Sequence, residues 1–138
     1  MLKDSKTFSS FSVNDLARAR EFYGEILGLN IHDDEKMPNL LNLEINKENV
    51  ILIYPKPNHV PATFTILNFN VQNIEQTVDE LTSRGVKFII YNDENFKTNE
   101  KGILAGNDQG PTIAWFNDPA GNILSVIQSG NWSRVYQF

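Results

Sequence analysis

The chain has no cysteine among its 138 residues. Disulfides and thiolate metal ligands are therefore excluded, although a domain that builds its own apolar core needs neither. Long apolar runs are also missing, so no segment is suited to cross a membrane, and the residues after Met1 lack the apolar core of a secretory signal. These absences predict a cytoplasmic protein with no membrane partner.

Positive charge and histidine are scarce. Twelve Lys and Arg residues stand against 17 Asp and Glu, which gives a net charge of -5. This balance argues against a nucleic-acid partner and tolerates a cationic ligand, although acidity also serves solubility alone. The two histidines, His32 and His59, lie in different segments without ligand spacing. We interpret both imidazoles as solvated rather than metal-binding.

Familiar catalytic motifs are absent as well. The sequence has no Ser-His-Asp arrangement, no Gly-rich phosphate loop and no cysteine nucleophile. Asp93-Glu94 and Glu100 form an acidic stretch that is typical of a solvated surface. Lys87 precedes the long loop at 92–110 and Lys97 lies near its start, but nothing marks either as buried enough to act as an amine nucleophile. The sequence therefore marks no catalytic residue.

Apolar residues are plentiful, at 41% of the chain, and aromatic residues make up 11%. This composition and length predict one packed domain. The clearest local signal is a hairpin at residues 115–127. Pro119 presets φ for a type I turn, Asp118 can accept hydrogen bonds from the turn amides, and Gly121 can take the left-handed conformation that follows.

The turn also predicts the register of the two strands that it joins. Asp118 should face Asn122, which places Phe116 opposite Leu124 and Trp115 opposite Ser125. Strand alternation then puts Trp115, Ile123, Ser125 and Ile127 on one face of the sheet.

The chain contains an internal duplication. The first half predicts a strand at 7–13, a helix that begins after Asn14-Asp15 and ends at Gly28, and strands at 29–34, 39–45 and 49–54. The second half predicts a strand at 63–71, a helix from Asn73 to Gly85, strands at 86–91, 111–117 and 122–128, and a polar loop at 92–110. An offset of 58 residues aligns Phe11 with Phe69 and Val13 with Val71.

These patterns predict a single α+β domain over residues 1–138. Module one covers about 6–54, a proline-rich connector 55–61, and module two about 62–128. The tail at 129–138 is unusually apolar, with Trp132, Val135, Tyr136 and Phe138. We expect it to pack on the domain or on a neighbouring molecule.

The turn Asp118-Pro119-Ala120-Gly121-Asn122, together with the duplication, resembles the vicinal oxygen chelate superfamily. This superfamily includes glyoxalases, bleomycin-resistance proteins and dioxygenases, and the pentapeptide is closest to the bleomycin-resistance form. The resemblance implies two tandem βαβββ modules forming a curved mixed β-sheet trough with helices on the outer face. It also implies a homodimer, either side by side or swapped.

Metal-using members place His or Glu ligands at four positions that face the trough. The resemblance puts these positions at Phe8, near Leu52, at Ile66 and at Ser125. The three apolar side chains offer no lone pair, and a serine hydroxyl is a poor ligand for a divalent transition metal. We therefore expect no metal and no other cofactor.

The trough lining that follows from strand alternation is apolar and neutral. A small, largely apolar or aromatic organic molecule is the ligand that such walls suit, with antibiotic sequestration as the family's precedent. The predicted ligand-binding residues are Phe8, Ser10, Ser12, Leu52, Tyr54, Ile66, Asn68, Asn70, Trp115, Ile123, Ser125 and Ile127.

Two alternatives stay open. One is a lyase, isomerase or dioxygenase that uses replacement ligands or an acid/base pair, with Glu44 and Tyr54 as the candidates. The other is a filled trough in a protein whose surface serves assembly. The loop at 92–110, with glycines at 102, 106 and 110, is either a lid or a connector.

Overall fold

The computed structural model describes residues 1–106 and 110–128, and the tail at 129–138 lies outside the described residues. The chain divides into two compact units, the first module (Met1–Pro61) and the second module (Ala62–Phe138). The boundary falls at the end of the proline-rich connector. Among the described residues, no helix is long and apolar enough to cross a membrane.

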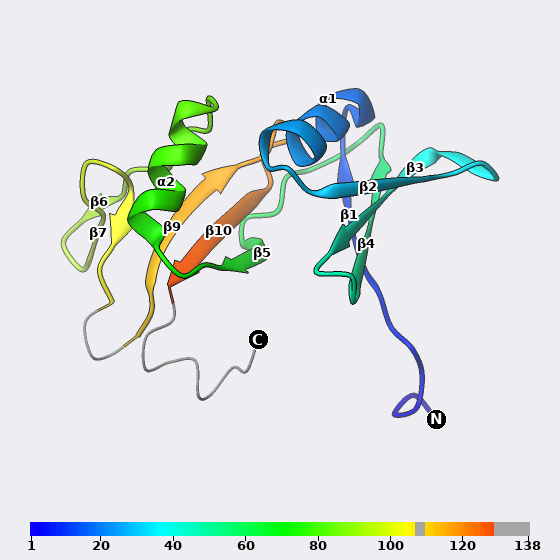
Figure 1. The fold of residues 1–138 in the computed structure, drawn as a ribbon, viewed down its shortest axis with the longest axis horizontal. Coiled ribbons are helices and arrows are strands. Elements are labelled where there is room, and N and C mark those ends of the chain that lie inside the picture. The colour runs from blue at the N-terminus through cyan, green and yellow to red at the C-terminus, as the bar shows by residue number, and fades with distance from the viewer. Residues whose placement is uncertain (107–109, 129–138) are drawn as a thin grey trace. The chain divides into compact units, whose positions relative to one another are not determined.

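The first module is built on a four-stranded mixed sheet (Figure 1). Its strands are β1 (Ser9–Val13), β2 (Asn30–Asp34), β3 (Met37–Ile45) and β4 (Asn49–Pro55), in the order β1-β4-β3-β2. β1 runs parallel to β4, and the other two pairings are antiparallel. Asn46 and Lys47 turn the chain between β3 and β4 at φ values of 57° and 61°.

One helical segment covers this sheet. α1 (Leu16–Arg20) begins at Asp15, whose carboxylate accepts a hydrogen bond from the Arg18 amide at 3.1 Å. It continues as the π-helical segment η1 (Glu21–Ile26), which ends before Gly28 at a φ of 72°. The predicted start and end of the helix are confirmed, whereas its π-helical second half was not anticipated.

The core of the first module lies between this helical segment and the sheet. Side chains of alternate strand residues, among them Val13, Leu41 and Ile53, are 1% exposed or less, as is Tyr23 of the helix. Phe11 also points to this side, since its ring centroid lies 5.7 Å from that of Tyr23. The opposite side, here called the helix-free face, therefore carries the intervening residues of the strands, and these are more polar.

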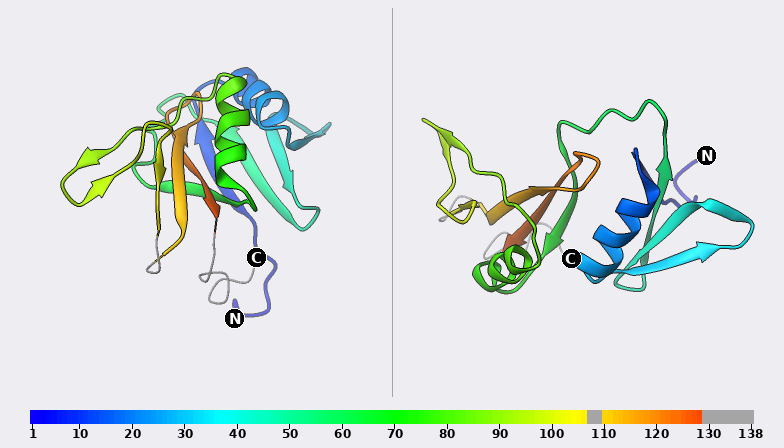
Figure 2. Two further views of the ribbon diagram at one scale, coloured as in Figure 1. Left: turned by 60° about the vertical axis from the view of Figure 1, so that its left-hand side comes forward. Right: turned by 90° about the horizontal axis from the view of Figure 1, so that it is seen from above.

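The second module repeats the plan with β5 (Thr65–Asn70), β8 (Ile103–Leu104), β9 (Thr112–Asn117) and β10 (Ile123–Gln128), in the order β5-β10-β9-β8. β5 and β10 are parallel, as β1 and β4 are. α2 (Ile74–Ser83) packs on β9 and β10 (Figure 1). A small separate hairpin of β6 (Asn92–Asp93) and β7 (Phe96–Lys97) projects from this module (Figure 2).

α2 is held at its first turn from two sides. The Asn73 side chain accepts a hydrogen bond from the Gln76 amide at 3.0 Å, as an N-cap does. The Gln128 side chain of β10 accepts from the Ile74 amide at 2.9 Å, which ties the helix to the sheet. Gly85 ends the helix at a φ of 96°, so the predicted helix is confirmed.

The predicted strand at 86–91 is wrong. Only Phe88 forms a bridge, to Phe116, and the fourth strand of the sheet is the two-residue β8 from the predicted loop. The reason is close packing of the backbone at Gly102, where a Cβ atom would lie 2.8 Å from the Phe88 Cβ. With φ at 88°, Gly102 lets the chain fold back over Phe88 and enter the sheet edge itself.

The hairpin of β9 and β10 follows the prediction. Phe116 pairs with Leu124 and Trp115 with Ser125. Gly121 has a φ of 85°, and the Asp118 amide donates to the Asn122 carbonyl at 2.9 Å. In this register Trp115 and Ser125 lie on the same face of the sheet. The face opposite α2 is likewise called the helix-free face of the second module.

Candidate functional site

The helix-free faces of the two sheets carry equivalent residues at equivalent places. Ser10 pairs with Leu52 in the first module, and Asn68 pairs with Ser125 in the second. Because Ser10 and Asn68 are related by the offset of 58 residues, Leu52 and Ser125 occupy matching positions on the last strands. The strand register thus selects Leu52 among the residues near it as the counterpart of Ser125.

Ser125 lies at the centre of the candidate site in the second module. Its side chain is fully buried, and its hydroxyl donates a hydrogen bond to the Asn68 side-chain oxygen on the neighbouring strand. On the other neighbouring strand, β9, Trp115 is the residue that pairs with Ser125. A buried hydroxyl with an amide acceptor satisfies its hydrogen-bonding needs without an ion.

Three aromatic rings, here called the aromatic cluster, pack together at Trp115, the cross-strand neighbour of Ser125. The Trp115 ring centroid lies 5.5 Å from that of Tyr91 and 5.1 Å from that of Phe96. Tyr91 and Phe96 are 5.0 Å apart in an edge-to-face arrangement. The sequence predicted Trp115 alone, since Tyr91 fell in a predicted strand and Phe96 in a predicted loop. The β6–β7 pairing, which brings residues 92–97 together, was the missing signal.

The base of the β6–β7 hairpin fixes two members of the cluster. The Tyr91 amide donates to the Thr98 hydroxyl at 3.0 Å, and the Thr98 amide donates to the Tyr91 carbonyl at 3.0 Å. Thr98 is only 6% exposed. Tyr91 and Phe96 are therefore presented to Trp115 by a hydrogen-bonded structure rather than by a loose loop.

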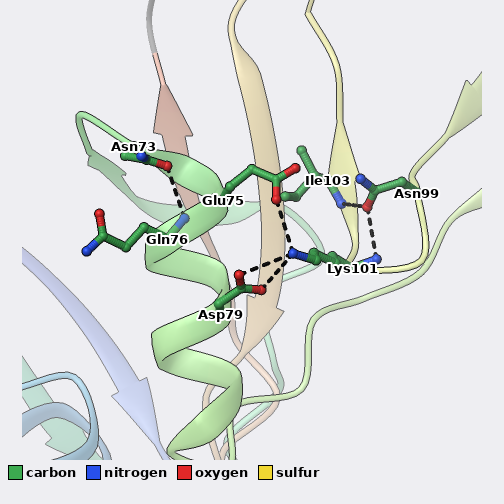
Figure 3. Close-up of polar contacts among 7 residues, drawn as sticks. All are labelled: Asn73, Glu75, Gln76, Asp79, Asn99, Lys101 and Ile103. Atoms are coloured by element: carbon green, nitrogen blue, oxygen red, sulfur yellow. Dashed lines mark hydrogen bonds and ion pairs between the residues drawn. The ribbon is translucent and has the colours of Figure 1, made fainter.

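A tight turn continues from this hairpin to β8 (Figure 3). The Asn99 side chain accepts hydrogen bonds from the amides of Lys101 and Ile103, each at 2.9 Å. The Lys101 ammonium lies 3.1 Å from a Glu75 oxygen and 3.0 Å from an Asp79 oxygen of α2. Hydrogen bonds to Asp79 and to Glu75 raise the pKa of Lys101.

In the first module, the helix-free face contains a hydroxyl–imidazole contact. Ser12 Oγ and His59 Nδ1 are 2.7 Å apart, and both residues are half-buried. The connector folds back here because the Lys56 amide donates to the Val13 carbonyl at 2.9 Å. The interpretation of His59 as a solvated loop residue is therefore wrong. A parallel pairing of β1 and β4 brings the end of β4 beside the end of β1, and this pairing was the missing signal.

A second polar pair lies on the same face. His32 Nε2 of β2 hydrogen-bonds with Glu44 Oε2 of β3, so His32 is not simply solvated. Nearby on β2, Asp33 is ion-paired with Arg20, and the hydrogen bond from the guanidinium lowers the pKa of this carboxyl. Glu44, the predicted acid/base candidate, thus has an imidazole partner that the sequence did not indicate.

The other predicted lining residues are less enclosed. Phe8 precedes β1 and is 70% exposed, and Ser10, Asn68 and Asn70 are also exposed. Ile66 lies where the register of β5 shifts against β10, since Thr65 and Leu67 pair with consecutive residues. The half-buried ones are Ser12, Leu52, Tyr54, Ile66, Trp115, Ile123 and Ile127.

The residues at the four family ligand positions do not fit a divalent metal ion. Phe8, Leu52 and Ile66 carry no donor atom, and the Ser125 hydroxyl is engaged with Asn68. Over residues 1–106 and 110–128, no three His, Asp or Glu side chains gather as a metal site would require.

Two modules with matching strand order, each with a helix on one face of a four-stranded mixed sheet, define a duplicated α+β fold. The family is shown by sequence. The profile of the Glyoxalase/Bleomycin resistance protein/Dioxygenase superfamily matches residues 8–126, and the chain belongs to this superfamily. No curated protein sequence matches the chain.

Solved structures share the fold at low sequence identity. A glyoxalase family protein from Bacillus anthracis has 19% identity and a TM-score of 0.68, over 94% of this chain and 99% of its own. TnmS3, an antibiotic binding protein from Streptomyces sp. CB03234, has 20% identity and a TM-score of 0.64, over 91% and 98%. A glyoxalase/dioxygenase from Nostoc punctiforme has 14% identity and a TM-score of 0.66, over 91% of each chain.

Proposed function

We propose that this protein binds a small, largely apolar or aromatic organic molecule on a helix-free face of its sheets, without a metal ion. One observation carries the proposal: the aromatic cluster stands next to the Ser125–Asn68 hydrogen bond in the second module. Aromatic rings supply contact area, and a few neutral polar groups fix a ligand's orientation.

Metal independence rests on the donor chemistry of the four ligand positions. Three of these side chains are hydrocarbon, and the fourth is a hydroxyl bonded to an amide oxygen. A transition metal would have to compete with that hydrogen bond and would gain one weak ligand. Binding alone is sufficient for drug sequestration, so the proposal requires no catalytic residue.

Sequestration of an antibiotic is the form of this function that we favour. It is supported by the fold shared with TnmS3, an antibiotic binding protein, and by the neutral, aromatic character of the cluster.

The proposal also includes a cytoplasmic homodimer with no nucleic-acid or membrane partner. Sedimentation velocity tests the dimer, and a monomer at micromolar concentration would contradict it.

The test uses a protein in which Trp115 is the single tryptophan. The Trp132→Phe variant provides it, because the chain has two tryptophans. Doxorubicin serves as a polycyclic aromatic probe, and kanamycin as a non-aromatic polycation. We expect doxorubicin to quench Trp115 and to release heat in calorimetry, with and without EDTA, whereas kanamycin does neither. The affinity for doxorubicin measured by calorimetry should fall at least tenfold in Trp115→Ala.

No response to a broad panel of aromatic antibiotics would contradict the proposal. Binding that needs an added divalent metal would contradict its metal-independent part. Phe64→Ala is a matched control, since Phe64 is an exposed aromatic residue, 67% accessible, that precedes β5. It should leave the affinity unchanged.

A second candidate function is favoured by the His32–Glu44 hydrogen bond. A carboxylate paired with an imidazole can move a proton, as a lyase or isomerase of this superfamily would need. Turnover of a bound compound by the wild type, lost in Glu44→Gln with its affinity retained, would support this function. Binding without turnover would leave sequestration as the function.

A further inference from the structure

We propose that Lys101 is a positioning residue that holds the aromatic cluster together through its ion pairs with α2. The inference rests on the proposed function for its consequence, which is slow release of an aromatic ligand. The Lys101 side chain bonds to Glu75 and Asp79 rather than to a ring of the cluster, so its action passes through the turn and the hairpin that precede it.

The path from Lys101 to the cluster is short and hydrogen-bonded. Lys101 and Thr98 are three residues apart, and Asn99 between them accepts from the Lys101 amide at 2.9 Å. Thr98 is bonded in both directions to Tyr91. Since Tyr91 contacts Trp115 and Phe96, a shift of this turn would move the rings of the hairpin against the sheet.

The other end of the path is anchored on a rigid element. Glu75 and Asp79 are four residues apart on α2, so their carboxylates share one side of the helix (Figure 3). Two like charges at this spacing repel each other, and the Lys101 ammonium lies between them, 3.1 Å and 3.0 Å away. Removing Lys101 therefore loses two attractions and leaves a repulsion behind.

The size of the effect follows from solvent exposure. The three side chains are 38%, 62% and 58% exposed, so each ion pair is weak and sensitive to salt. Two such pairs together shift a local equilibrium about threefold to tenfold. This is enough to open the hairpin more often and too little to unfold the domain.

Hydrogen exchange tests the positioning role without any ligand. In Lys101→Gln we expect the amides of Tyr91 and Thr98 to exchange about threefold to tenfold faster than in the wild type. Lys101→Arg should restore slow exchange. Lys97→Gln is the matched control, because it removes the same charge from an exposed position of β7 and should change nothing. The free energy of global unfolding should fall in Lys101→Gln by the same small amount, because the unfolded chain also lacks the ion pairs, so the domain stays folded under the conditions of exchange.

A charge exchange separates the ion pairs from the side chain itself. Lys101→Glu should speed exchange, and combining it with Glu75→Lys should restore part of the protection, since an oppositely charged pair forms again. High salt should speed exchange in the wild type and leave Lys101→Gln unaffected. Equal exchange rates in the wild type and Lys101→Gln would overturn the inference.

Stopped-flow release of doxorubicin tests the consequence. We expect release from Lys101→Gln to be faster by a factor similar to that of exchange. If the wild type binds no aromatic probe, the proposed function fails while the exchange experiment still decides the role of Lys101. If the probe binds and neither exchange nor release changes in Lys101→Gln, the inference fails and the proposed function stands.

Discussion

Replacing Asp118 by alanine should destabilise the second module more than any other single change in its β9–β10 turn. The Asp118 carboxylate accepts hydrogen bonds from the amides of Ala120 and Asn122 at 2.9 Å and 2.8 Å, and from the Asn122 side chain at 3.0 Å. Asp118 is only 4% exposed and Asn122 only 2%, so water replaces these bonds poorly.

Hydrogen bonds to a charged group contribute about 1.5–3 kcal/mol each, and three that share one side chain are not additive. We therefore expect Asp118→Ala to lower the free energy of unfolding by about 3–5 kcal/mol. For a domain of this size, this corresponds to a fall in Tm of roughly 10–20 °C. Urea unfolding followed by circular dichroism, together with calorimetry, gives both values.

Asp118→Asn separates the roles of the two carboxylate oxygens. Its remaining oxygen can still accept from both backbone amides, whereas its NH₂ group faces the Asn122 side-chain donor. We expect about half of the alanine effect. Asp93→Ala, at an exposed position of β6, is the control and should stay within about 0.5 kcal/mol. A loss below about 1 kcal/mol in Asp118→Ala would refute the reasoning.

Three further predictions concern other parts of the chain. Arg20 holds the pKa of Asp33 low, so the pair stabilises the fold above the unfolded carboxyl pKa and this contribution is lost as the pH falls through the lowered folded pKa. NMR titration of Asp33 should show its pKa rising in Arg20→Gln, and an unchanged pKa would count against the pairing. Gly102→Ala should cost about 1–3 kcal/mol more than Gly85→Ala, because both have positive φ but only Gly102 brings a Cβ within 2.8 Å of Phe88. Equal thermal shifts would disprove the steric reason. Dialysis against EDTA should leave doxorubicin binding unchanged, and stoichiometric zinc, iron, nickel or manganese in the purified protein would contradict this.

Much of the fold could be predicted from the sequence, because the signals were local. Asn73 and Gly85 bound α2, and the Asp118–Asn122 turn sets the register of β9 and β10. The duplication predicted the equivalence of the two modules, since a shared offset relates residues that occupy the same place in each sheet. Such features depend on the backbone preferences of a few neighbouring residues.

The failures arose where distant segments decide the outcome. Residues 86–91 have the composition of a strand, but β8 takes the sheet edge because Gly102 permits a close approach to Phe88. His59 and Phe96 looked like loop residues, yet tertiary folding places one on Ser12 and the other on Trp115. Pairings of this kind have no local sequence signature, so two of the three rings of the aromatic cluster and both imidazole contacts were beyond sequence reasoning.

The parallel pairing of the first and last strands in each module has a consequence for synthesis of the chain. β1 finds its partner once Pro55 has been made, whereas β5 must wait for β10, which ends at Gln128. At about 5–20 residues per second, translation separates these two closures by several seconds. The first sheet can therefore complete its ladder while the edge of β5 is still unpaired, and nascent chains are most exposed to edge-to-edge aggregation during that interval.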